Sequence, residues 1–282
     1  MLRWVVGRQP ALWTTKSTVH RAHEAYADPV KDRHADDWEE LARREPYFAV
    51  LTNEGYLGVD GNSVATASFF ETGEADIAAL LPAIATLRNR ELVLGSVLDF
   101  GCGVGRLSLP LARRATRVTG CDIAPTMLTH ARVNAERAGL RNATFVQNDE
   151  LAGLPDGQFD FICSLLVFQH IPPATGYGLL RSLFRLLAPG GMAALHVTFE
   201  RPGGGLRRLA RMARARSPLV HRVVGAVRND SLRLPYMQMN EYDQRVVVRD
   251  LEHAGARVVG ALPTHHGDTT GAVLVIEKST AP

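Results

Sequence analysis

The feature that most constrains the fold is a short apolar run, residues 97–100, that breaks into glycines at positions 101, 103 and 105. An amphipathic stretch follows at once, with apolar side chains at Leu107, Leu109, Leu111 and Ala112. This pattern predicts a strand, a tight turn and a helix. Glycine lets the backbone turn sharply and approach a ligand, and the following helix start offers unpaired N–H groups. The segment therefore indicates a nucleotide-type cofactor site at the carboxyl edge of a parallel sheet.

The spacing of the glycines excludes the usual dinucleotide fingerprint. That pattern, counted from Gly101, needs a glycine at position 106, where Arg106 stands. The next expected strand, residues 117–122, ends in Asp122, whose carboxylate can accept both hydrogen bonds of a ribose diol. The alternative is that Asp122 caps a helix over residues 124–127.

Further strands and helices follow in a regular order. A third strand is expected over residues 143–147 and a fourth over 159–166. A leucine stripe then indicates a helix that Pro189 and two glycines stop, before a fifth strand over 192–199. Two further strands are expected over residues 257–262 and 271–278. The link between them, residues 263–270, is short enough for the two strands to form an antiparallel pair.

Together these motifs resemble the class I S-adenosylmethionine-dependent methyltransferases, well over residues 74–200 and less specifically over 236–278. The resemblance implies a doubly wound α/β fold, with a mostly parallel seven-stranded sheet and an antiparallel last strand. Residues 1–73 would form an N-terminal helical extension or lid, and residues 74–282 the cofactor domain. Residues 200–240 would form an arginine-rich helical cap inserted after strand five.

The resemblance also assigns the cofactor contacts. Asp99 would meet the amino end of the methionine moiety, directly or through water, or else bond the N–H groups of the glycine loop. Gly101 and Gly103 allow close backbone approach, whereas Gly105 serves helix packing. Asp149 would meet the adenine amino group, although the neighbouring Asn148 could take that role. The remaining expected cofactor contacts are Ile123, Met127 and a backbone N–H of Glu150 or Leu151.

Three histidines are candidates on the acceptor side. His170 follows the fourth strand, and a neutral imidazole is a suitable base near pH 7. The alternative is that its ring nitrogens bond the loop backbone. His265 and His266 lie between the last two strands, but neighbouring residues of an extended chain point to opposite faces. A metal site is not expected, because Cys102, Cys121 and Cys163 form no C-x-x-C pair and are interpreted as buried reduced thiols.

Composition is ordinary for a soluble protein, with 46% apolar and 22% charged residues. No stretch approaches the ~20 apolar residues of a membrane span, and the N-terminus lacks a signal-peptide core, so a cytoplasmic location is expected.

Residues 201–235 hold nine arginines against one acid, Asp230. This segment is a solvated face, a cap that attracts an anionic substrate, or an interfacial helix. No nucleic acid is expected as a partner, and a homodimer remains open.

In the N-terminal region, Asp36 is expected to cap a helix over 37–45, and a longer helix is expected over 74–87 despite Pro82. Asn240 is expected to cap a helix over 241–253. Four aromatic residues form either a lid over the site or plain hydrophobic packing: Tyr26, Trp38, Tyr47 and Phe48. Packing is the favoured interpretation for Trp38.

The predicted function is methyl transfer from S-adenosylmethionine to a small molecule by in-line displacement. O-methylation of a natural product or a saccharide is favoured. Methylation of a peptide or a lipid-linked substrate, on nitrogen or oxygen, is the enzymatic alternative. The non-enzymatic alternative is a cofactor-binding scaffold or an inactive partner subunit, against which the intact glycine loop and Asp122 argue.

Overall fold

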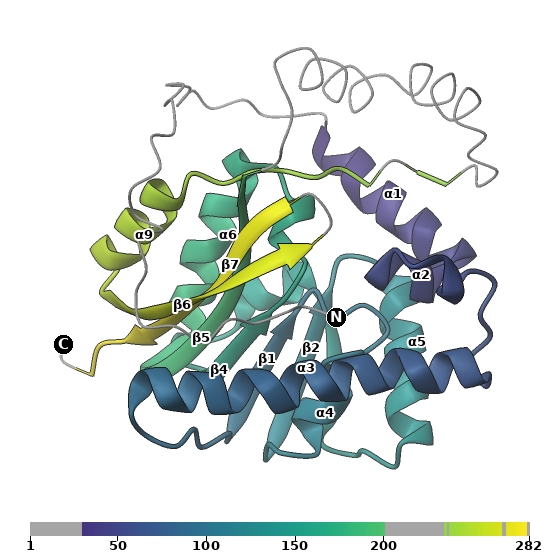
Figure 1. Cartoon of the computed structure of the whole chain (residues 1–282), viewed down its shortest axis with the longest axis horizontal. Coiled ribbons are helices and arrows are strands. Elements are labelled where there is room, and N and C mark those ends of the chain that lie inside the picture. The colour runs from purple at the N-terminus through teal and green to yellow at the C-terminus, as the bar shows by residue number, and fades with distance from the viewer. Residues whose placement is uncertain (1–29, 201–233, 236, 267–268, 281–282) are drawn as a thin grey trace.

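The computed structural model describes residues 30–200, 234–235, 237–266 and 269–280. Their centre is a seven-stranded sheet in the order β3-β2-β1-β4-β5-β7-β6 (Figure 1). Strands β1 to β5 are parallel, and β7 runs antiparallel to both β5 and β6. The expected sheet is thereby confirmed. The strands are β1 Ser96–Phe100, β2 Arg117–Asp122, β3 Ala143–Gln147, β4 Phe159–Ser164, β5 Leu187–Glu200, β6 Ala256–His266 and β7 Thr269–Lys278.

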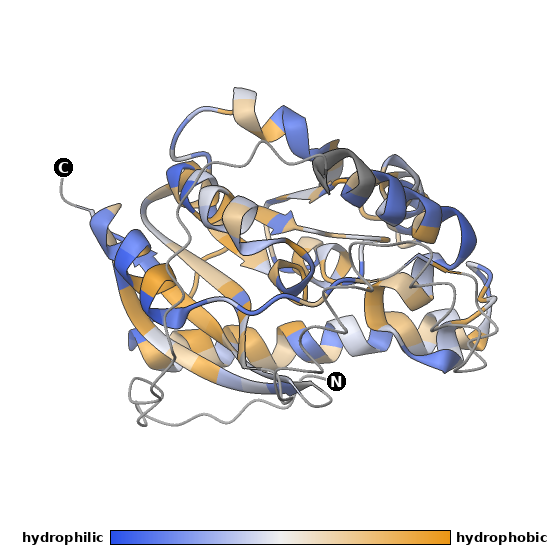
Figure 2. Cartoon of the chain, turned by 90° about the horizontal axis from the view of Figure 1, so that it is seen from above, coloured by the Kyte–Doolittle hydropathy of each residue, from blue (hydrophilic) through white to orange (hydrophobic). Residues whose placement is uncertain are grey.

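Helices cover both faces of this sheet. One apolar layer joins α3 Val64–Arg88 and α4 Ser108–Ala112 to the strands, and α5 Pro125–Arg137 packs beside α4. The other layer joins α6 Pro173–Leu186 and α9 Gln244–His253 to the opposite face. Figure 2 shows the hydrophobic residues gathered on the strands and on the helix faces turned toward them. Every residue of β1 is buried, as a strand covered on both faces requires.

The order of the strands reverses beside β1. From β1 the chain passes to β2 and β3 on one side, and then returns to place β4 and β5 on the other. Loops that leave the carboxyl ends of β1 and β4 therefore diverge and leave a crevice between them. Such a switch point is where open α/β sheets bind ligands.

The N-terminal helices differ from the expected ones. Helix α1, Val30–Arg44, already includes Asp36, so Asp36 does not cap it. Pro46 follows α1 and also begins a second helix, α2, Pro46–Leu51. Proline is well tolerated in the first turn of a helix, because the N–H groups there have no partner within the helix. Tyr26 lies outside the described residues. A short turn over Glu54–Tyr56 then leads toward α3.

Helix α3 begins ten residues before the expected start at Glu74. Ser63 caps it by accepting a hydrogen bond from Thr66 N, and Pro82 lies inside it without ending it. One continuous helix thus runs across the boundary expected between residues 73 and 74. The sequence before Glu74 contains several turn-forming residues, which obscured the cap.

The C-terminal elements also differ in their bounds. Helix α9 is capped by Asp243, which accepts a hydrogen bond from Arg245 N, whereas Asn240 N donates to Gln169 O. The expected link over residues 263–270 is largely strand, because β6 continues to His266. The leucine-rich helix α6 ends at Leu186, before Pro189. Most of the predicted arginine-rich cap, residues 201–233, lies outside the described residues.

Candidate functional site

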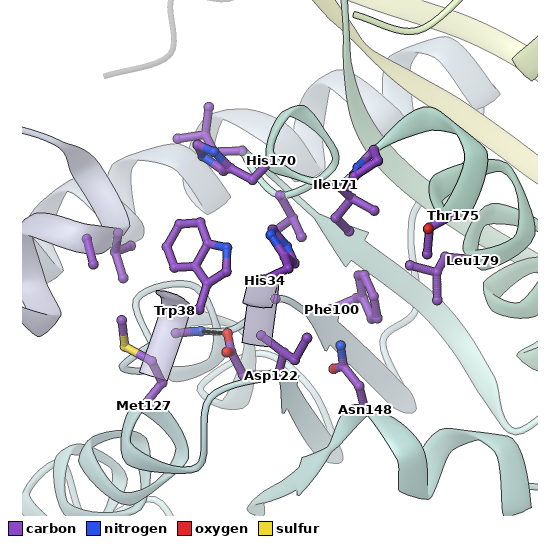
Figure 3. Close-up of a pocket in the computed structure, with 18 of the residues that line it drawn as sticks. His34, Trp38, Phe100, Asp122, Met127, Asn148, His170, Ile171, Thr175 and Leu179 are labelled. Atoms are coloured by element: carbon purple, nitrogen blue, oxygen red, sulfur yellow. Dashed lines mark hydrogen bonds between the residues drawn. The ribbon is translucent and has the colours of Figure 1, made fainter. Parts of the chain in front are cut away.

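A cavity of about 680 Å³ opens at the carboxyl ends of β1, β2 and β4 (Figure 3). Its floor is the glycine loop and the ends of these strands. Its opposite wall comes from α1 and α2, and its side comes from the loop after β4 and the first turns of α6. The volume is within the range of small-molecule and cofactor sites.

The glycine loop forms the floor because no side chain fits there. Gly101 and Gly103 have φ of 76° and 53°, and both line the cavity. A Cβ on Gly101 would lie 2.3 Å from a methyl group of Val167, and one on Gly103 would lie 2.7 Å from a methyl group of Val50. Gly105 is not on the wall: its Cβ would meet Leu109 at 2.8 Å, in keeping with the predicted packing role.

Asp122 lies on the cavity wall at the end of β2. Its carboxylate accepts hydrogen bonds from Gly103 N at 2.9 Å and from Ala124 N at 3.0 Å. Burial raises its pKa, while the hydrogen bonds from neighbouring backbone N–H groups oppose that shift. A carboxylate has about four acceptor positions, so these backbone hydrogen bonds leave acceptor capacity for a ribose hydroxyl. The capping alternative is not realised, because Ala124 is the N-cap residue of α5 and no side chain caps that helix; at its start, Asp122 bonds only the backbone N–H of Ala124 itself.

Asp99 is not on the cavity wall, which argues against the expected direct contact with the methionine moiety. Only 1% of its surface is exposed, and Ser108 Oγ donates to its carboxylate at 2.6 Å. Burial raises the pKa of Asp99 to about 6, against the opposing effect of the Ser108 hydrogen bond. Its described role is to join the end of β1 to the start of α4.

The expected adenine side is partly assembled. Ile123, Met127, Asn148 and Asp149 all line the cavity. Glu150 does not: its carboxylate accepts a hydrogen bond from Gln147 N and closes the turn after β3. Leu151 is also absent from the wall; its side chain is buried in the layer beneath α6.

His170 lines the cavity, with both ring nitrogens in hydrogen bonds. Nδ1 lies 2.7 Å from the carbonyl oxygen of Gln238, and Nε2 lies 3.0 Å from Gln169 Nε2. A carbonyl only accepts, so Nδ1 carries a proton. Nε2 then accepts from the Gln169 amide, or donates to it if the amide is turned over. Neither arrangement leaves a free lone pair on this ring.

The two C-terminal histidines both lie at the end of β6, in the ladder that β6 forms with β7. His265 is exposed, pairs with Thr270 across the β6–β7 ladder, and is not on the cavity wall, so the predicted site role is not supported for it. His266 pairs with Thr269 in the same ladder. The side chain of His266 lies outside the described part of the chain.

The sequence analysis missed the contribution of α1. His34 and Trp38, four residues apart on one face of this helix, both line the cavity. The Trp38 ring meets the His170 ring edge to face at 5.1 Å. Trp38 therefore lies over the site, contrary to the favoured packing interpretation, although it also contacts the apolar cluster of α1 and α2. Tyr47, by contrast, is buried against Phe69 and takes no part in the wall.

The segment 238–242 lies along the loop after β4. Besides the Gln238 contact with His170, Asn240 N donates to Gln169 O and Tyr242 Oη donates to Ile171 O. Tyr242 N also donates to Thr198 O on β5. This segment therefore fixes the cavity lip to the end of β5.

The three cysteines are free and buried, and burial raises the pKa of each thiol. Within the described ranges, no group of three or more histidine, cysteine or acidic side chains is placed to hold a metal ion. None of the described helices combines the length and apolar character needed to cross a membrane.

Residues 97–191 match a family described as a methyltransferase domain. The ubiquinone biosynthesis O-methyltransferase of Psychrobacter cryohalolentis is 36% identical over 109 residues, which are 38% of this chain and 42% of that protein. The protein of the same name from Xanthomonas euvesicatoria is 34% identical over 113 residues, or 40% and 46% of the two chains. The chain thus spans less than half the length of the curated relatives that it matches.

Solved structures resemble a larger part of the chain. Magnesium protoporphyrin IX methyltransferase from Synechocystis, with bound S-adenosylhomocysteine, has a TM-score of 0.56 at 21% identity, over 89% of this chain and 98% of that one. The cyclase SpnF has a TM-score of 0.57 at 16% identity, over 88% and 96%. These likenesses show the fold. Because one of the two proteins is a cyclase, the fold alone does not determine the reaction.

Proposed function

We propose that the chain, whose residues 97–191 match a methyltransferase domain, is a class I S-adenosylmethionine-dependent enzyme that transfers a methyl group to a small-molecule acceptor. The observation that carries this proposal is the paired arrangement of Asp122 and the glycine loop. A buried carboxylate of a kind that can accept hydrogen bonds from a diol and a backbone floor that excludes side chains meet beside the switch point of the sheet. S-adenosylmethionine presents a ribose diol and a sulfonium-bound methyl group to such a floor.

Different residues of the cavity wall would bind different parts of this cofactor. Asp122 would accept the ribose hydroxyls, and Ile123 and Met127 would pack beside the adenosine. Asp149 would accept from the adenine amino group, with Asn148 beside it. The methionine portion would lie on the backbone of Gly101 and Gly103. When bound, the cofactor supplies an activated methyl carbon, and the protein orients an acceptor oxygen in line with it.

The acceptor half of the cavity favours an apolar molecule. Trp38, Val50, Ile171, Pro172 and Leu179 form this part of the wall. Among the described lining residues there is no lysine or arginine, so the part of the wall that the structure describes offers no cation to an anionic acceptor. We therefore favour O-methylation of an apolar natural product over a saccharide. The names of the relatives from Psychrobacter and Xanthomonas, which are O-methyltransferases, support oxygen as the acceptor atom.

His170 would contact this acceptor through its ring and orient it. Its two hydrogen bonds fix the ring plane against Trp38, so it is a rigid part of the wall. His170→Ala is expected to lower turnover while leaving cofactor affinity nearly unchanged. Equal losses in both quantities would contradict this role.

The proposal is tested in two steps. Calorimetry with S-adenosylhomocysteine measures cofactor binding, and mass spectrometry then detects methylated products from 4-methylcatechol, 4-methylphenol and methyl glucoside. Binding followed by methylation of a phenol supports the proposal, and methylation of the glucoside alone would favour the saccharide alternative. Binding without any turnover, with lipid-linked and peptide hydroxyls included, would favour the scaffold alternative. Absence of binding would refute the assignment of the cavity.

A further inference from the structure

We propose that His34, on α1, accepts the proton of the acceptor hydroxyl during methyl transfer. This inference rests on the proposed function and adds a catalytic residue to it. It assigns to α1 a chemical role, in addition to its role as a wall of the cavity.

The position of His34 is defined by the packing of α1 over the site. Figure 3 shows the His34 ring directed into the cavity, between Trp38 and Ile171. Trp38, one turn later, meets the His34 ring edge to face at 6.3 Å. Next to Trp38 on the same helix, Glu39 accepts hydrogen bonds from Thr126 N and Oγ1 at the start of α5. These contacts hold the imidazole over the floor formed by Asp122 and the glycine loop.

His34 has the free lone pair that His170 lacks. Among the described residues, none forms a hydrogen bond with either ring nitrogen of His34, and its described contact is the ring of Trp38. In His170, both nitrogens are engaged by Gln169 and Gln238. Of the two imidazoles on the wall, only His34 can therefore accept a proton without first breaking a hydrogen bond.

The surroundings of His34 keep it neutral. Burial lowers its pKa below the ordinary 6.5, because the cationic form loses its hydration. The other titratable groups on the cavity wall are His170 from the loop after β4, Asp122 from β2 and Asp149 from the turn after β3. A neutral imidazole above pH 6.5 is the form that a general base requires.

The reaction step is balanced by this assignment. An oxygen lone pair of the acceptor forms the new O–C bond while the S–C bond of the donor breaks and its electron pair stays on sulfur. The hydroxyl proton passes to the free nitrogen of His34. Imidazolium, methyl ether and neutral thioether result, and the proton then leaves to water. No oxidant, reductant or metal enters the step.

The test compares His34→Gln with wild type and with His253→Gln, which removes an exposed histidine from the last turn of α9. With 4-methylcatechol as the acceptor, His34→Gln is expected to lower kcat by about 10²–10⁴-fold. It should also abolish the fall of kcat/KM at low pH, while the affinity for S-adenosylhomocysteine stays within about twofold. His253→Gln should match wild type in all three measurements.

A second readout does not depend on turnover. Histidine ring resonances in NMR spectra, assigned to His34 by their loss in His34→Gln, should titrate below pH 6.5 in the cofactor-free protein. Titration at or above 6.5, or an acid limb that persists in His34→Gln, would overturn the proposal. Should the protein bind the cofactor yet methylate no phenol, the proposed acceptor class fails, and the NMR titration still decides whether His34 is a neutral base.

Discussion

Glu39 on α1 accepts two hydrogen bonds from Thr126 on α5, at 3.1 Å from its backbone nitrogen and at 2.6 Å from Oγ1. The two residues are far apart in the sequence, and the contact joins the helix that covers the cavity to the helix behind Asp122. A negative side chain at the start of α5 also satisfies N–H groups that the helix leaves unpaired. This contact fixes the distance between the wall that holds His34 and the floor.

Removal of this contact is expected to loosen α1. Glu39→Ala should cost about 1 kcal/mol of the free energy of unfolding, as loss of a helix cap does. It should also weaken cofactor binding, because the cavity closes less firmly. Chemical denaturation and calorimetry measure the two effects. Arg43→Ala, which removes the exposed partner of Glu39 on the same helix, should change neither quantity by more than about 0.5 kcal/mol.

Asp122 is expected to supply a large share of cofactor affinity. Asp122→Ala should weaken binding of S-adenosylhomocysteine by about 1–3 kcal/mol, through the loss of charge-assisted hydrogen bonds. That loss corresponds to roughly 5- to 150-fold in Kd. Asp156→Ala, a change at a solvent-exposed ion pair with Arg185, is the control. Unchanged calorimetric affinity in Asp122→Ala would refute the ribose assignment.

Asp99 is expected to make stability depend on pH. Since its folded-state pKa is about 6, the folded chain holds a proton that the unfolded chain has already lost above about pH 4. This contribution is therefore complete below about pH 4 and is lost as pH rises through about 6. Asp99→Asn should exceed wild type in the free energy of unfolding at pH 8, by up to about 3 kcal/mol. Urea denaturation at pH 4 and pH 8 checks this; an equal difference at both pH values would contradict it.

Gly101 is expected to tolerate no side chain. Gly101→Ala places a Cβ 2.3 Å from Val167 at a φ of 76°. Gly139 has a φ of 69° and open space around it, so an alanine there serves as a control for the free-energy cost of a positive φ without a clash. Gly139→Ala should cost about 1–2 kcal/mol, and Gly101→Ala about 1–3 kcal/mol more because of the clash. Thermal denaturation compares the two. Similar losses in both variants would show that Val167 moves away freely.

The cofactor floor was predictable because its signals are local. The acid, glycine and strand pattern of residues 97–122 specifies its own turn and places Asp122 beside Gly103. His34 was missed as a wall residue, and Trp38 was assigned to packing over the lid alternative, because the place of α1 depends on Glu39 meeting Thr126, a contact between distant parts of the chain. Asn240 was predicted as a cap from its residue type, but its backbone bonds Gln169 and the cap falls to Asp243. Contacts between residues far apart in the sequence decided both the position of α1 and the bonding of Asn240, and the local sequence pattern does not predict such contacts.

The anchoring of segment 238–242 has a consequence for how such a protein can change over evolution. The bond from Tyr242 to Thr198 brings the chain back beside the point where β5 ends, so the residues between start and finish near one another. A loop with tethered ends can lengthen at small entropic expense, about 0.6 kcal/mol for each doubling. The bonds from segment 238–242 to β5 and to the loop after β4 therefore keep the cavity lip beside the glycine-loop floor, whatever the length of chain between Glu200 and this segment.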